Sequence, residues 1–183
     1  MRLRLLLLVS LLNVFAYAFW GPLFTVYAVS LGASPSLAGS LFAFFAFSHA
    51  LAILFFGKLD NHSTRFRNVV VGYSIQGLCA ILFISISNPI FLFVPLFLSA
   101  TSGGMIAPAW KALYTNALTK DKEGTEWSYA DAGTYFATSA GAFLAGLIAN
   151  TYSYKAIFVP LLVINLATSL ILVKKRHLLQ SQV

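Results

Sequence analysis

The chain has 183 residues, of which 59% are hydrophobic and only 9% are charged. A soluble domain carries about 25% charged residues, so this composition excludes a water-soluble core and indicates a membrane protein. The formal net charge of +7 lies in short segments between apolar stretches. This distribution favours a role in membrane topology over nucleic-acid binding, and we expect a lipid bilayer rather than a nucleic acid as the partner.

Six apolar stretches are each long enough to cross a bilayer. About 20 mostly apolar residues span the hydrocarbon layer as a helix, and continuous runs of this length predict helices rather than barrel strands. The predicted spans are residues 5–31, 37–56, 69–86, 90–114, 127–149 and 156–173. We therefore predict an all-α, polytopic membrane protein in which residues 1–183 form one six-helix domain.

Positive charge collects in alternate gaps between the predicted spans. Of the twelve lysines and arginines, all but Lys155 fall on one side of the membrane in this topology. They precede the first span, lie between the second and third, surround the connection of the fourth and fifth, and follow the sixth. Because positively charged loops stay in the cytoplasm, we predict an integral protein of the plasma membrane with both termini cytoplasmic.

Six spans divide into two triplets, and because three is odd the second triplet must be inverted relative to the first. Gly21 and Pro22 lie late in the first span, while Gly103, Gly104 and Pro108 lie late in the fourth. Helix interruptions at corresponding positions of two repeats indicate a binding region. An ordinary transmembrane kink is the alternative.

Two segments carry a family resemblance. Residues 57–67 read GKLDNHSTRFR, and residues 107–114 read APAWKALY and lead to KEGTEWS at 122–128. The first is similar to the signature loop of the major facilitator superfamily, which has a glycine, an acidic residue, a second glycine and a basic end. Asn61 takes the acidic position with Asp60 beside it, Thr64 replaces the second glycine, and Arg65 and Arg67 keep the basic end.

The chain thus resembles one half of a major facilitator superfamily transporter over nearly its whole length. Such transporters usually have twelve spans in two halves related by an axis along the membrane normal. The resemblance implies a gradient-driven transporter of a small organic solute that works by alternating access as a parallel homodimer. A hetero-pair, a non-transporting membrane subunit or a gene fragment are the alternatives.

No enzymatic activity, cofactor or metal is expected. Three scattered histidines and one cysteine do not supply a clustered ligand set. The arginine that many proton-coupled members carry in helix four is replaced near Ser99 and Ala100, so proton coupling is not inferred.

The resemblance implies that the first and fourth spans line the solute cavity. Asn13, Tyr17, Trp20 and Phe24 recur on one helical face of the first span. We expect solute contacts from these four residues, from His49 in the second span, and from Ser99 and Trp110 in the fourth. Aromatic packing, and a histidine bonded to a neighbouring backbone, are equally open interpretations.

Charged residues near the cytoplasmic side form the predicted gate. Asp131 lies inside the fifth span at a depth similar to that of Lys111 in the fourth, so an ion pair is expected, either fixed or changing between states. The loop residues Asp60, Arg65 and Arg67 are expected to form state-dependent contacts. A merely solvated basic loop is the alternative.

Two further expectations concern packing. Gln76 and Asn165 lie in spans that the resemblance places on the outside, and we assign them packing roles. The fifth span carries small residues at four-residue spacing, at Gly133, Ala137, Gly141 and Ala145. This stripe allows close helix contact, either within the protomer or with a partner.

Overall fold

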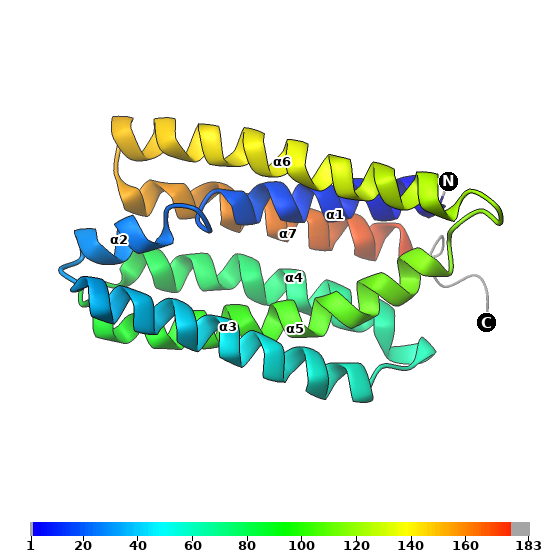
Figure 1. The fold of residues 1–183 in the computed structure, drawn as a ribbon, viewed down its shortest axis with the longest axis horizontal. Helices are drawn as coiled ribbons and strands as arrows, with labels where there is room; N and C mark the ends of the chain where they lie inside the picture. Colours follow the sequence, from blue (N-terminus) through cyan, green and yellow to red (C-terminus); the bar gives the residue numbers. More distant parts are fainter. Residues whose placement is uncertain (1, 177–183) are drawn as a thin grey trace.

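The computed structural model describes residues 2–176 and consists of long helices that run along a common direction (Figure 1). The helices are α1 (Arg2–Ala18), α2 (Phe24–Ser30), α3 (Pro35–Lys58), α4 (His62–Ser85), α5 (Phe93–Thr115), α6 (Glu123–Thr151) and α7 (Phe158–Lys174). Short 3-10 turns, η1 (Pro89–Leu92) and η2 (Tyr154–Ile157), lead into α5 and α7. The all-α prediction is confirmed, and the described part of the chain contains no strand.

Five of these segments are long and apolar enough to cross a membrane: α3, α4, η1 with α5, α6, and η2 with α7. The predicted first span corresponds to two helices, α1 and α2, which are separated by turns at residues 19–23. Pro22 lies within these turns and has no backbone N–H to continue a helical ladder. Three-residue turns cross the break, with Trp20 N donating to Tyr17 O at 3.1 Å and Leu23 N to Trp20 O at 3.1 Å.

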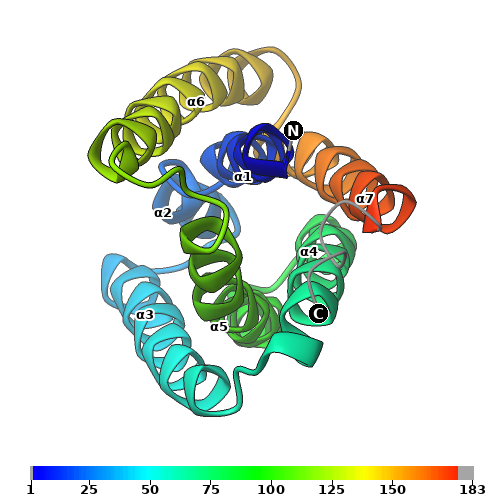
Figure 2. The same cartoon turned by 90° about the vertical axis from the view of Figure 1, so that its right-hand side faces the viewer.

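Viewed along their axes, the helices form two rows, with α6, α1 and α7 in one and α3, α5 and α4 in the other (Figure 2). α1 packs against α6 and α7, α5 packs against α3 and α4, and α4 joins the rows by packing against α7. This pattern is unchanged when α1 is exchanged with α5, α3 with α6, and α4 with α7. α1 and α5 are therefore the equivalent central helices of the two rows.

An aromatic core fills one end of the bundle. Trp20 and Phe83 lie 5.5 Å apart between ring centroids, and Phe83 stacks on Phe158 at 4.7 Å. The hydroxyl of Tyr27 in α2 donates to the backbone carbonyl of Phe83 in α4 at 2.5 Å, which satisfies the polar end of a fully buried side chain. The break after α1 thus turns the chain so that α2 closes this end.

The stripe of small residues on α6 packs within the protomer. A Cβ atom added at Gly133 would lie 2.8 Å from Leu11 Cδ2, and one added at Gly141 would lie 2.7 Å from the Phe15 carbonyl oxygen. Both neighbours belong to α1, so the stripe allows α6 to approach α1 closely. The opposite face of α6 is open, and Tyr135 and Phe136 are 75% and 77% exposed.

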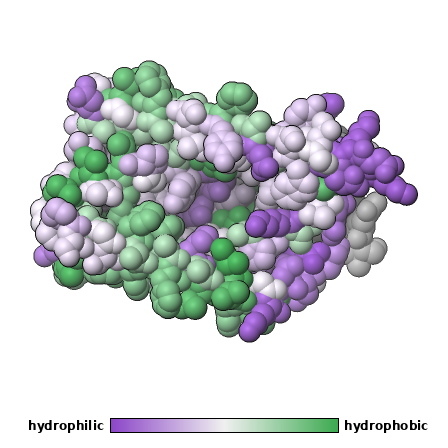
Figure 3. Space-filling view, in the orientation of Figure 1, coloured by the Kyte–Doolittle hydropathy of each residue, from purple (hydrophilic) through white to green (hydrophobic). Residues whose placement is uncertain are grey.

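The start of α1 and the end of α7 lie at one end of the bundle, together with the α3–α4 and α5–α6 connections (Figure 1). The space-filling view shows hydrophilic residues gathered at this end, whereas the rest of the lateral face is largely hydrophobic (Figure 3). The lysines and arginines other than Lys155 accordingly lie at the end that the sequence pattern predicts to be cytoplasmic.

Candidate functional site

A polar cavity of about 330 Å³ lies between the two central helices. Its lining residues come from four helices: Asn13 and Tyr17 from α1, Phe45 and His49 from α3, Gln76 from α4, and Gly103, Ile106 and Ala107 from α5. The side view of the molecule shows a hollow near the middle of the face with hydrophilic residues at its floor (Figure 3). The bundle therefore holds hydrogen-bonding groups at membrane depth on a lateral face.

Three amide side chains form one hydrogen-bonded network, and two of them, Asn13 and Gln76, line the cavity. Asn13 Nδ2 donates to Gln76 Oε1 at 2.7 Å and to Asn165 Oδ1 at 2.8 Å. Asn165 is fully buried, and its Nδ2 donates to the Leu161 carbonyl at 3.1 Å. The network joins α1, α4 and α7, so Gln76 and Asn165 do more than fill space in outward-facing helices. The sequence feature that indicates such a network is an amide side chain inside an apolar span, because a polar group there needs a hydrogen-bond partner.

His49 forms part of the cavity wall. Its Nδ1 lies 3.1 Å from the carbonyl oxygen of Ala100 in α5, and because a carbonyl only accepts, Nδ1 carries the hydrogen. The imidazole stacks on Phe45 with ring centroids 5.8 Å apart. A Cβ atom at Gly103 would lie 2.9 Å from His49 Nδ1, so this glycine leaves room for the ring against α5.

Only the first half of the face that the sequence predicts on the first span lines the cavity. Asn13 and Tyr17 line the cavity, whereas Trp20 and Phe24 are 4% and 1% exposed and pack in the aromatic core. The reason is the end of α1 at Ala18, since residues beyond a helix break no longer continue its face.

The structure also changes the expectation for the fourth span. Ser99 is buried and does not line the cavity, and Trp110 stacks on Tyr114 with ring centroids 4.8 Å apart. Trp110 belongs to a second apolar cluster at the cationic end. The cavity wall of α5 is made by Gly103 and Ile106, which share a helical face with Ser99 and Trp110, and by Ala107.

The predicted ion pair between Lys111 and Asp131 is not formed. Both side chains are exposed, and the pair between Arg65 and Asp60, at 2.8 Å, is the only salt bridge among residues 2–176. The prediction placed α5 and α6 side by side because they are consecutive in the chain. In the structure α6 packs against α1, in the other row.

The signature-like loop begins α4. Asn61 is the N-cap, and its side chain accepts from the Thr64 backbone N–H at 3.1 Å, while Thr64 Oγ1 accepts from the Asn61 N–H at 3.3 Å. These two residues, which depart from the family pattern, thus form a reciprocal capping box. Arg65 pairs with Asp60 next to this cap, and Arg67 is exposed.

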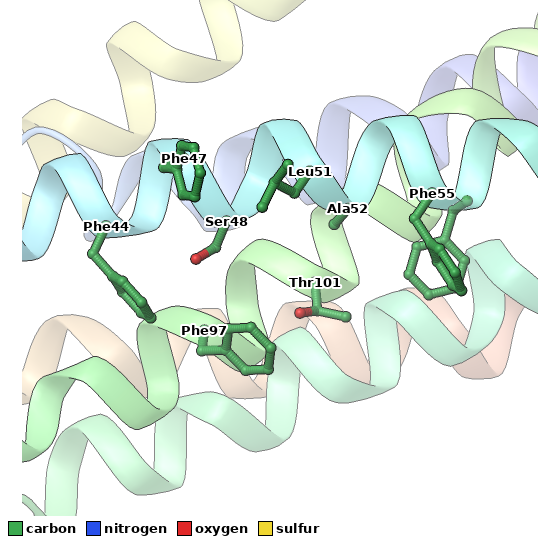
Figure 4. Close-up of a pocket in the computed structure, with 9 residues that line it drawn as sticks. Phe44, Phe47, Ser48, Leu51, Ala52, Phe55, Phe97 and Thr101 are labelled. Carbon is green, nitrogen blue, oxygen red and sulfur yellow. The ribbon is translucent and has the colours of Figure 1, made fainter.

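A second, apolar groove of about 460 Å³ lies between α3 and α5. Six of its nine lining residues are phenylalanine or leucine, including Phe44, Leu51 and Phe97. The hydroxyls of Ser48 and Thr101 point into the space between the helices (Figure 4). Because these two hydroxyls are its only polar side chains, the groove is less suited to an organic solute than the cavity at Asn13.

An apolar helical bundle with a network of amides at its centre defines an integral membrane protein built around a polar cavity. The model of the Major Facilitator Superfamily matches residues 6–181, so the chain belongs to this family of membrane transporters, and the resemblance seen in the sequence is confirmed. None of the curated proteins compared with the chain matches it.

Proposed function

We propose that this chain is one six-helix unit of a gradient-driven transporter of a small organic solute, and that two copies in the same orientation form the pathway. The observation that carries the proposal is the polar cavity at Asn13, Gln76 and His49, which lies in the middle of an apolar bundle. Rocking of one unit against the other exposes this cavity alternately to the two sides of the membrane.

The lateral opening of the cavity supports a second unit. Unsatisfied polar groups that face hydrocarbon cost free energy, and the hydrophilic floor of the hollow is visible from the side (Figure 3). α3 and α6 are the helices with the smallest buried share among the five spans. A second copy that covers the open faces of α3 and α6 encloses the cavity and makes it part of a continuous pathway.

The topology proposed for each unit is two inverted triplets within residues 1–183. The exchange of α1, α3 and α4 with α5, α6 and α7 preserves the helix packing, which supports such a repeat. The collection of cationic residues at one end supports cytoplasmic termini in the plasma membrane.

Gating belongs to the cationic end. The proposed groups are the paired Asp60 and Arg65, and the exposed Arg67, Lys111 and Asp131. These exposed charges are available to a second copy when that end closes. If Asp131→Asn leaves the rate of uptake and its pH dependence unchanged, Asp131 has no part in the gate.

The test of the proposal is uptake by proteoliposomes that contain only this chain. The transporter function predicts saturable, counterflow-stimulated uptake of one class of solute from a panel of radiolabelled sugars, nucleosides, amino acids and carboxamides. Gln76→Ala, which removes a cavity amide, is expected to abolish it, whereas Asn150→Ala on the exposed end of α6 is expected to leave it intact. Uptake that matches protein-free liposomes for the whole panel contradicts the proposal.

A further inference from the structure

We infer that the solute is small, uncharged and planar, and that one edge carries a hydrogen-bond donor beside an acceptor, as in a carboxamide or a lactam. The inference rests on the proposed transport function and concerns the same cavity. Three features of the cavity carry it: the absence of charge from the lining, the orientation of the amides, and the aromatic walls.

The first feature is charge. The eight lining residues include no aspartate, glutamate, lysine or arginine. On the lining stretch of α5, Lys111 lies one turn beyond Ala107 toward the cationic end and is exposed. An ion in this cavity would lose hydration without gaining a counter-charge, which disfavours anions and cations alike. In a homodimer the second copy supplies the same eight residues, again without aspartate, glutamate, lysine or arginine.

The second feature is the orientation of the amides, which the backbone determines. Because the Leu161 carbonyl accepts from Asn165 Nδ2, the Asn165 Oδ1 faces Asn13. Asn13 must therefore present its NH2 group there, and the second hydrogen of this group goes to Gln76 Oε1. In this series of hydrogen bonds, the orientation of each amide group thus follows from that of the previous one.

This chain of bonds leaves one acceptor on Asn13 and one donor on Gln76, two amide groups that are joined by a hydrogen bond of 2.7 Å. Both hydrogens of Asn13 Nδ2 are used, so its Oδ1 is available as an acceptor, and Gln76 Oε1 is used, so its Nε2 is available as a donor. Neither free atom has a hydrogen-bond partner in the part of the chain that the structure describes. A carboxamide or lactam edge complements this pair with one N–H and one C=O.

The third feature is shape. The rings of Tyr17, Phe45 and His49 line the cavity and offer flat apolar surface next to the free amide atoms. The volume of about 330 Å³ lies at the small end of the ~300–1,000 Å³ range of ligand sites. A single ring with an amide edge fits this space better than a long or branched solute.

The experiment measures binding to the purified full chain in nanodiscs with probes of similar shape that differ in charge. The first set is benzamide, benzoate and benzamidinium, and the second is uracil with its carboxylated analogue orotate. We expect the uncharged probes to bind saturably and the charged ones to bind at least about tenfold more weakly, because the cavity offers hydrogen bonds but no counter-charge.

The informative variant is Gln76→Glu. It keeps an oxygen that accepts from Asn13 Nδ2 and replaces the free donor Nε2 by a carboxylate oxygen. Benzamide and uracil are then expected to lose at least about tenfold in affinity, while benzamidinium gains, because the donor is lost and a negative charge is added. Asn88→Asp is the matched control, since it makes the same chemical change at an exposed N-cap whose side chain still accepts from Ile90 N.

The outcomes separate the inference from the proposed function. Tighter binding of benzoate, orotate or benzamidinium to the unchanged protein overturns the uncharged solute and leaves transport standing. Unchanged benzamide and uracil affinities in Gln76→Glu overturn the assignment of the free donor. If no probe binds and proteoliposomes take up no solute, both the inference and the proposed function fail.

Discussion

The two central helices, α1 and α5, occupy equivalent places in the two rows but respond differently to the same residue types. α1 ends at Ala18, and the chain passes through Gly21 and Pro22 in turns before α2 begins. α5 contains Pro108 and remains one helix over Phe93–Thr115. A proline late in a span therefore does not decide by itself whether the helix breaks.

The difference lies in what packs beside each helix. A Cβ atom at Gly104 would lie 2.7 Å from the backbone carbonyl carbon of Ala52. The glycine pair therefore lets α5 pack directly against α3, and this contact keeps α5 helical on both sides of Pro108. The three atoms nearest to a Cβ added at Gly21 all belong to Tyr17, in the same segment of the chain. Free of such a neighbour, the chain turns after α1 and places Trp20 in the aromatic core.

The largest effect is expected from Gly104→Ala. The added methyl would meet the Ala52 and Ile53 backbone, which cannot rotate away, so we expect a loss of about 3 kcal/mol in unfolding free energy. The measurement is the unfolding midpoint in mild detergent. Gly146→Ala is the control, because no atom lies within 4 Å of its added Cβ. Equal midpoints for the two variants would remove the close α3–α5 contact from the explanation.

Asn13→Ala tests the polar half of α1. The variant removes both bonds of Asn13 Nδ2 and leaves Gln76 and Asn165 without their donor, which we expect to cost about 1–2 kcal/mol. Solute uptake is expected to disappear as well. The same unfolding assay and proteoliposome uptake measure the two effects. Full uptake by a stably folded Asn13→Ala protein would place the solute elsewhere.

Pro108→Ala tests how much the proline inside α5 costs that helix. Alanine restores a backbone N–H that can donate to the Gly104 carbonyl, so the unfolding free energy is expected to rise by about 1 kcal/mol. This is less than the ~3 kcal/mol of a proline in an isolated helix, because the packed helix already accommodates the ring. A clear loss of stability would show that the proline itself holds the packing of α5.

The smallest change in stability is expected from Gly21→Ala. The new Cβ would lie 2.9 Å from Tyr17 Cε1, at the far end of a side chain that can rotate, so the unfolding free energy should stay within about 0.5 kcal/mol. The displaced ring lines the cavity, so solute affinity should fall although the fold is kept. Gly39→Ala, with open space around its Cβ, is the control for binding. An unchanged affinity would exclude Tyr17 from the site.

Much of this architecture could be predicted because hydropathy and charge act along the chain. The apolar runs predict helices, and the alternate cationic gaps place the loops at two ends. The packing partners could not be read in the same way. Lys111 and Asp131 are near in sequence and depth, yet their helices lie in different rows. The spacing of Trp20 and Phe24 assumed an unbroken helix, and the structure ends α1 before them.

The site was only partly predictable for the same reason. Asn13, Tyr17 and His49 could be named because polar or aromatic residues inside apolar spans are costly unless they have partners. Gln76 and Asn165 carry the same signal, but the outward position implied for their helices led to packing roles. Their amides bond to Asn13 from α4 and α7, and this contact depends on how both helices pack against the rest of the bundle.

The central claim is that one copy of this chain supplies half of a solute pathway. Native mass spectrometry of the full chain released from mild detergent, together with uptake by the same preparation, tests it most directly. The account predicts two copies per particle and saturable uptake that is lost in Gln76→Ala. A particle with a single copy that still transports would contradict it.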